Sequence, residues 1–223
     1  MESRHINTQS ISLSLSETTV LKNTYLLLSG TLLFSAGCAW FALISNAQPL
    51  GFLTTLIGIF GLSYLTQALK NSAMGLLAIF AFTGFLGYTL GPMFNMIIAS
   101  YTNGADIIFT ALGATGIIFL ALSAYVLTTR KNFSYMSGFL FSAMIIVFLL
   151  SLANLFFQFP ILNILISGAF AMLSSALILY QTSAVINGGE RNYIMATIQI
   201  FMALFNLFIS LLNLLTIFAG SRD

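Results

Sequence analysis

The chain has 223 residues, of which 59% are hydrophobic and only 5% are charged, and its formal net charge is +2. A soluble domain carries about 25% charged residues, so this composition excludes a water-exposed globular surface. The small, scattered positive charge gives no indication of nucleic-acid binding. The single cysteine, Cys38, excludes an intrachain disulfide. The composition therefore predicts a membrane protein.

The first 22 residues form a polar segment that is rich in serine and threonine and contains His5, the only histidine. Apolar residues alternate with serines over residues 11–16, which is typical of a strand, but the segment is too short and polar for a core of its own. Two interpretations stay open: a solvated tail, or an extended handle that another protein grips by alternate side chains. Ser16 followed by Glu17 indicates a helix start, with an N-cap and an acidic first turn.

Seven apolar blocks follow, and each reaches the roughly 20 residues that a helix needs to cross a bilayer. Short breaks with turn-forming residues separate them, so consecutive helices are antiparallel neighbours in one bundle. We expect an all-α membrane protein with a cytoplasmic tail over residues 1–22 and a seven-helix transmembrane domain over residues 23–223. The expected helices are 24–45, 50–69, 74–100, 106–128, 136–157, 161–186 and 193–218.

The third block carries Gly84, Gly87 and Gly91 along one helical face, followed by Pro92. Small residues at this spacing allow helix backbones to approach closely. Pro92 removes a backbone donor and predicts a kink near Tyr88. The face is interpreted as a packing surface, with a gating hinge as the alternative.

The last two blocks carry polar side chains that recur every seven residues, which is close to two helical turns, so each set lies on one face. These stripes should face protein, because a polar side chain in lipid is costly. They act either as interhelical hydrogen-bond contacts, worth about 0.6–2 kcal/mol each, or as the lining of a hydrated ion path. The residues are Ser167, Ser174 and Gln181 in the first set and Gln199, Asn206 and Asn213 in the second, where Ala203 and Ser210 share the face. The fifth block adds Ser151, Asn154 and Gln158, to which the same two interpretations apply.

Ionisable groups are almost confined to the tail, the loops and the C-terminus. Asp106 stands at the outer edge of the fourth helix, and Glu190 lies in the loop before the last. The sequence therefore lacks the residues for a catalytic pair, for a histidine–metal site and for the buried acid of a coupled transporter. We expect no enzyme activity, no cofactor and no metal site.

Several motifs at matching spacing resemble the Bax inhibitor family over the chain from Ser16 onward. They are residues 20–28, 81–92, 124–131 and 179–182, and the run that reaches 206–208. The loop over residues 188–194 and the C-terminal residues 221–223 are most similar to the bacterial inner-membrane branch that modulates the FtsH protease.

The resemblance implies a seven-helix fold in which helix seven is central. In the calcium-leak branch an aspartate pair acts as a pH-sensitive latch, and those positions fall on Gln181 and Ala203. Neither residue ionises, so we do not expect the pH-sensitive latch of that branch in this chain. The FtsH-modulator branch implies a non-catalytic protein whose N-terminal tail is held by a membrane-bound AAA protease. A calcium or cation leak channel without the aspartate pair is the alternative.

Basic residues predict the orientation of the chain. Six of the seven fall on one side of the predicted membrane, and only Arg222 lies on the other. The positive-inside rule makes the first side cytoplasmic, so in a bacterial inner membrane the N-terminus is cytoplasmic and the C-terminus periplasmic. The six residues are Arg4, Lys22, Lys70, Arg130, Lys131 and Arg191.

Reporter fusions at the C-terminus test this orientation. A periplasmic alkaline phosphatase fused after Asp223 should be active, whereas a fluorescent protein that folds only in the cytoplasm should stay dark. The same pair of reporters fused after Arg130 serves as the control and should give the reverse pattern. A bright cytoplasmic reporter at the C-terminus would overturn the orientation.

Overall fold

A computed structural model describes the backbone of residues 2–220 and the side chains of residues 18–220. Helices make up nearly all of residues 2–220, and that range contains no strand. Residues 221–223, which carry part of the family resemblance, lie outside the described residues. The elements in chain order are α1 (Glu2–Ile44), α2 (Phe52–Leu69), α3 (Met74–Ser100), α4 (Gly104–Thr129), the short 3-10 helix η1 (Ser134–Met136), α5 (Ser137–Phe157), α6 (Pro160–Ile186) and α7 (Tyr193–Gly220).

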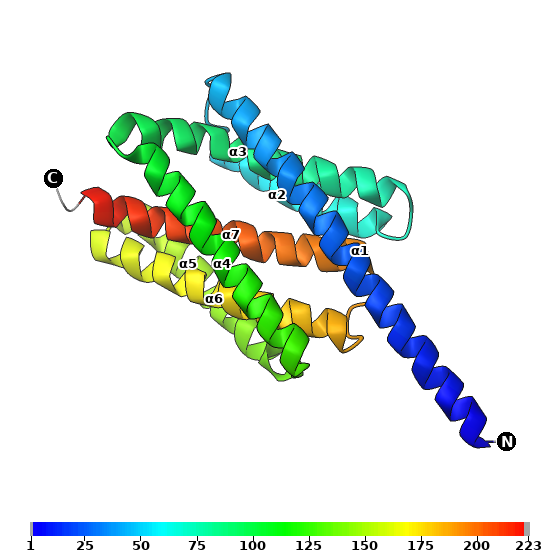
Figure 1. Ribbon diagram of the computed structural model, residues 1–223. Helices are drawn as coiled ribbons and strands as arrows, with labels where there is room; N and C mark the ends of the chain where they lie inside the picture. Colours follow the sequence, from blue (N-terminus) through cyan, green and yellow to red (C-terminus); the bar gives the residue numbers. More distant parts are fainter. Residues whose placement is uncertain (1, 221–223) are drawn as a thin grey trace.

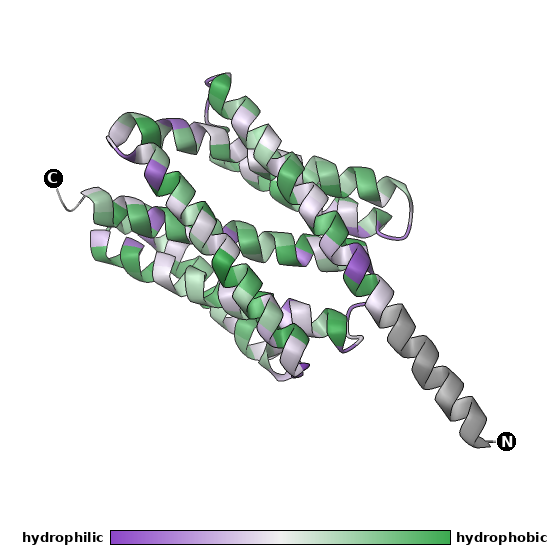
Figure 2. Cartoon of the chain, viewed as in Figure 1, coloured by the Kyte–Doolittle hydropathy of each residue, from purple (hydrophilic) through white to green (hydrophobic). Residues whose placement is uncertain are grey.

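Seven of these helices are long and apolar enough to cross a membrane, which confirms the predicted fold class. Apart from the start of α1, their ends agree with the predicted ends to within two residues. Large apolar side chains cover the outside of the bundle, including Trp40 at 64% exposed, Phe109 at 72% and Phe156 at 86%. Figure 2 shows mainly hydrophobic helices, with hydrophilic residues concentrated in the loops. Such a surface is suited to lipid and unsuited to water.

The helix start predicted at Ser16 is wrong, because α1 begins at Glu2. The extended conformation suggested by the alternation over residues 11–16 is wrong for the same reason. Extending an existing helix adds one hydrogen bond per residue and needs no new nucleus, so the membrane-length part Thr18–Ile44 can carry a polar extension. A period-two pattern also needs a partner strand to become a sheet. Side-chain roles in residues 1–17 lie outside the described side chains.

The seven helices form an up-and-down bundle with the two ends of the chain on opposite sides (Figure 1). Helix α7 lies at the centre, as predicted, and packs against α1, α2, α3, α4 and α6. Helix α5 is peripheral: it packs on α6 and η1, and its backbone does not come close to that of α7. Residues on several sides of α7 are buried, including the five consecutive residues Ile194–Ile198, as expected for a helix that packs against five others.

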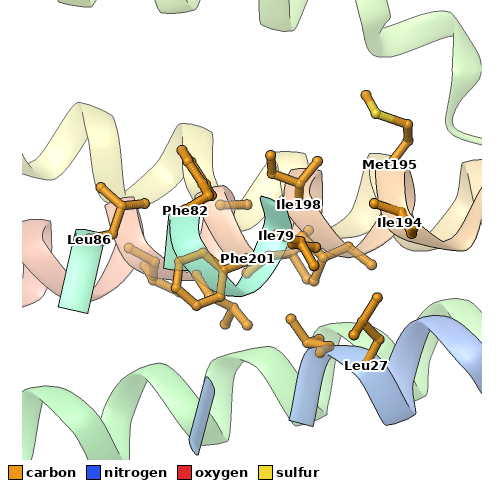
Figure 3. Packing of buried hydrophobic residues seen from close by; sticks show 14 residues of the cluster. Leu27, Ile79, Phe82, Leu86, Ile194, Met195, Ile198 and Phe201 are labelled. Carbon is orange, nitrogen blue, oxygen red and sulfur yellow. The ribbon is translucent and has the colours of Figure 1, made fainter. Parts of the chain in front are cut away.

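The main apolar core joins α7 to α1 and α3, as Figure 3 shows. Phe82 of α3 and Phe201 of α7 meet edge to face with ring centroids 6.5 Å apart. Both side chains are almost fully buried, as are Ile79 and Ile198 beside them. Aromatic edge-to-face pairs add about 0.5–1.5 kcal/mol beyond the burial of their area. This core places α7 against the α1–α3 pair.

The glycine face of α3 lies directly against α1. A Cβ atom added at Gly87 would meet the backbone oxygen of Ser35, and one added at Gly91 would meet Ala42. A Cβ at Gly84 would lie 2.6 Å from the Phe34 ring. The glycines therefore permit a contact that any larger residue would force apart. Pro92 lies inside α3, which continues to Ser100, so its role as a hinge stays a prediction.

The loops at the end of the bundle that carries the basic residues are held by side-chain hydrogen bonds. Asn192 accepts hydrogen bonds from the N–H groups of Ile194 (3.0 Å) and Met195 (3.1 Å), which caps α7. Its amide nitrogen donates to the Lys70 carbonyl (3.0 Å) and to Asn71 (2.9 Å), so the α2–α3 loop is tied to the start of α7.

Ser183, near the end of α6, makes the equivalent connection to the α4–α5 loop. Its hydroxyl donates to the Lys131 carbonyl at 3.0 Å and accepts from the Phe133 N–H at 2.9 Å. The side chain of Asn187 also donates to this hydroxyl, at 3.1 Å. Two long-range hydrogen-bond centres, at Asn192 and Ser183, therefore fix the loops at this end.

Replacing Gly87→Ala should lower the free energy of unfolding by about 1–3 kcal/mol, because the new methyl group meets the α1 backbone and cannot be absorbed by a side-chain rotation. The measurement is denaturant unfolding of the purified protein in mild detergent. Gly113→Ala in α4 is the matched control, since a Cβ there meets nothing within 4 Å. The control should be neutral or stabilising by about 0.5–1 kcal/mol. Equal effects of the two changes would contradict the packing role.

Candidate functional site

A polar chamber of about 630 Å³ lies between α5, α6 and α7. Twelve described residues line it, and none of them is charged. Eight of the twelve are polar, five of these being carboxamides and three hydroxyls. The polar residues are Ser151, Asn154 and Gln158 from α5 and its end, Asn163 and Ser167 from α6, and Asn206, Ser210 and Asn213 from α7.

Helical spacing explains why these side chains converge. Ser151, Asn154 and Gln158 are three and four residues apart, so they share one face at the end of α5. Asn206, Ser210 and Asn213 repeat the pattern on α7. Helix α6 packs on both α5 and α7, whereas the backbones of α5 and α7 do not come close to each other. The chamber is the space that this arrangement leaves.

One pair of carboxamides closes the turn between α5 and α6. The amide nitrogen of Asn154 donates to Asn163 Oδ1 at 2.6 Å, and Asn154 Oδ1 accepts from the Phe159 N–H at 3.1 Å. Gln158 adopts φ 51°, the left-handed conformation that ends a helix. Both polar groups of the Asn154 side chain therefore form hydrogen bonds within this turn.

Other lining groups remain without partners. Ser167 is only 8% exposed, and neither it nor the carboxamides of Asn206 and Asn213 forms a side-chain hydrogen bond within the described part of the chain. Ser210 differs, because its hydroxyl donates to the Asn206 carbonyl of its own helix at 2.7 Å. The chamber therefore offers free donors and acceptors.

The predicted lining residues divide between the chamber and the packed interior. Asn206 and Ser210 line the chamber. Ser174 and Ala203 are buried outside it, and the Ser174 hydroxyl has no partner among the described residues. Gln181 and Gln199 are half-buried and do not line it either. The role of these six residues as an ion-path lining or as helix contacts stays a prediction.

Sequence reasoning assigned no role to Asn163, Ser183 or Asn192, although the structure gives each a long-range or turn-closing hydrogen bond. Asn192 carried a usable signal, since an asparagine directly before an apolar helix is typical of an N-cap. Asn163 and Ser183 carried no such signal in the sequence, because their hydrogen-bond partners lie in other helices or loops.

The described residues contain no group of three or more His, Cys, Asp or Glu side chains that could hold a metal ion. A second cavity, of about 680 Å³, lies between α1, α2 and α3 and is mainly apolar. Gly84, Cys38 and Tyr88 are among the residues that line it. Within the described residues, the α5–α6–α7 chamber is thus the place where uncharged polar groups gather.

Comparison with known proteins gives a family and named relatives. The model of the family described as "Inhibitor of apoptosis-promoting Bax1" matches residues 17–220. An uncharacterized protein of Pseudomonas aeruginosa is 49% identical over 92% of this chain and 91% of its own length. A protein of Escherichia coli named "Modulator of FtsH protease YccA" is 45% identical over the same shares. An uncharacterized membrane protein of Vibrio cholerae is 41% identical over 94% of each chain.

Gln181 and Ala203, which stand where the calcium-leak branch is expected to carry two aspartates, provide a test of ion conduction. In calcium-loaded liposomes the unmodified protein should pass little calcium, and the double change Gln181→Asp with Ala203→Asp should raise the flux. Two acids at the latch positions would supply the charge that a neutral interior lacks. The uncharged isosteric pair Gln181→Asn with Ala203→Asn is the control, and size-exclusion chromatography should verify folding. Strong, proton-gated calcium flux through the unmodified protein would contradict this expectation.

Proposed function

The chain belongs to the Bax inhibitor family, and from this premise we propose that it is a non-catalytic protein of the bacterial inner membrane that binds and modulates an FtsH-type AAA protease. The observation that carries the proposal is the 45% identity, over 92% of the chain, to the Escherichia coli protein named as a modulator of that protease. The seven membrane-length helices agree with this location.

The charge distribution of the bundle supports a docking role. Among the described charged residues, Lys22 lies near the start of the membrane-length part of α1, Asp106 and Arg130 lie at the ends of α4, and the others lie in loops. The core around α7 holds no acidic or basic side chain among the described residues, and Gln181 and Ala203 stand at the latch positions. An uncharged interior binds ions weakly and has no group that titrates near neutral pH. Such a bundle is better suited to contact another protein than to conduct a regulated ion current.

Helix α1 provides the handle that the proposed partner would hold. Residues 2–17 precede the membrane-length part Thr18–Ile44 and, at about 1.5 Å per residue, extend some 24 Å along the helix axis. Figure 1 shows this end of α1 reaching past the other helices. With this end of α1 in the cytoplasm, the helical extension would stand where an ATP-driven protease can engage it.

Deleting residues 2–16 tests this handle. The deletion should abolish copurification with FtsH in mild detergent, while the bundle still folds, because the packed core begins at Thr24 and Leu27. A tail of the same length made of Gly and Ser serves as the matched control and should also fail to copurify. The second measurement is the turnover of a membrane substrate by the protease in cells that lack this protein. Undiminished copurification of the deletion variant would contradict the role of the tail.

A calcium or cation leak is the second candidate function, favoured by the polar chamber between α5, α6 and α7. Its lining supplies oxygen atoms from carboxamides and hydroxyls, which can coordinate cations but contribute no negative charge. The liposome flux measurement described above decides between this function and protease modulation.

A further inference from the structure

The chamber between α5, α6 and α7 has no part in the proposed contact with a protease, which uses the opposite end of the molecule. It extends from Gln158, at the end of α5, to Asn206, near the middle of α7. Both the end of α5 and the end of α7 lie on the C-terminal side of the bundle (Figure 1). The chamber therefore starts at one membrane surface and reaches the depth of the hydrocarbon core.

Polar groups at that depth need partners, because lipid provides none. Within the described chain, Ser167 is buried without a hydrogen-bond partner, and the carboxamides of Asn206 and Asn213 have none either. These groups come from two helices and line a single cavity. Because the described residues leave these groups unpaired, they are available to a molecule from outside the chain.

The lining also selects the kind of solute. A carboxamide offers two donors and an acceptor, and a hydroxyl offers one donor and two acceptor lone pairs. An ion would meet no opposite charge among the lining residues, in a surrounding of low dielectric constant where an uncompensated charge is costly. The volume of about 630 Å³ lies in the range of small-molecule sites, which is about 300–1,000 Å³.

We propose that the chamber is a binding site for small uncharged solutes that carry both hydrogen-bond donors and acceptors, such as carboxamides, and that these solutes enter from the C-terminal side of the membrane. Asn206, Asn213 and Ser167 supply the hydrogen bonds. Asn154 and Asn163 hold the turn that frames the mouth. The proposal is independent of protease modulation.

The first part of the test measures access. Single cysteines replace Asn213, Asn206 or Gln199 in a full-length Cys38→Ala protein in native membranes, and neutral iodoacetamide is added from either side. Asn213→Cys and Asn206→Cys should react from the C-terminal side, and Gln199→Cys, which lies outside the chamber, should react much more slowly. A charged methanethiosulfonate should react far more slowly with Asn206→Cys than with Asn213→Cys.

The second part measures binding, with nicotinamide as the probe and its charged isostere nicotinate as the control. The reporter is a single cysteine in place of Ile209, a lining residue that supplies no hydrogen bond, so Asn206, Asn213 and Ser167 stay intact. Nicotinamide should slow the labelling of Ile209→Cys by the factor 1 + [L]/Kd, whereas nicotinate at the same concentration should leave the rate unchanged. Adding Asn206→Leu should abolish the protection, and adding Gln199→Leu should leave it intact.

Four results would overturn the proposal. Equal, slow labelling at positions 206 and 199 would mean that the chamber is closed. Rapid labelling with no protection by nicotinamide would mean that it holds only water. Labelling that is blocked in native membranes and restored after purification would mean that a partner protein occupies it. Charged and neutral reagents reaching Asn206→Cys equally would also overturn it and would favour an ion path.

Discussion

Every polar side chain in the membrane-spanning part of this chain depends on the bundle for its hydrogen bonds, because lipid offers none. Many serine and threonine hydroxyls find a partner within their own helix. The hydroxyls of Thr66, Thr83 and Thr115 each donate to a carbonyl four residues earlier in the same helix, at 2.7–2.9 Å. Such residues can therefore be placed almost anywhere along a helix.

A carboxamide needs more hydrogen-bond partners than a hydroxyl does. The bundle provides these partners in different ways at its two ends. At the end with the basic loops, Asn192 and Asn187 bond to neighbouring loops and to the Ser183 hydroxyl. At the other end, Asn154 pairs with Asn163, while Asn206 and Asn213 face the chamber without protein partners. One end is thus closed by hydrogen bonds, and the other retains an open polar cavity.

This division fits a protein with two separate working surfaces. The closed end holds the loops rigidly around the point where α1 leaves the bundle, which suits a fixed platform for the helical N-terminal extension. The glycine contact between α1 and α3 and the Phe82–Phe201 core hold that helix in place. The open end provides neutral hydrogen-bonding groups at membrane depth, and Gln181 and Ala203 add no charge between the two.

The sequence by itself determined the membrane class, the seven helices and nearly all of their ends, because the hydrophobicity of about 20 successive residues is a local property. It also determined the family, since motifs that resemble those of the Bax inhibitor family occur along the chain from Ser16 onward. Only the tertiary structure decided that α1 starts at Glu2, that Asn192 joins the start of α7 to Lys70, and which of the predicted polar residues line a chamber. Periodicity gives the face on which a side chain lies, but the partner on that face comes from another helix, and its distance is set by packing.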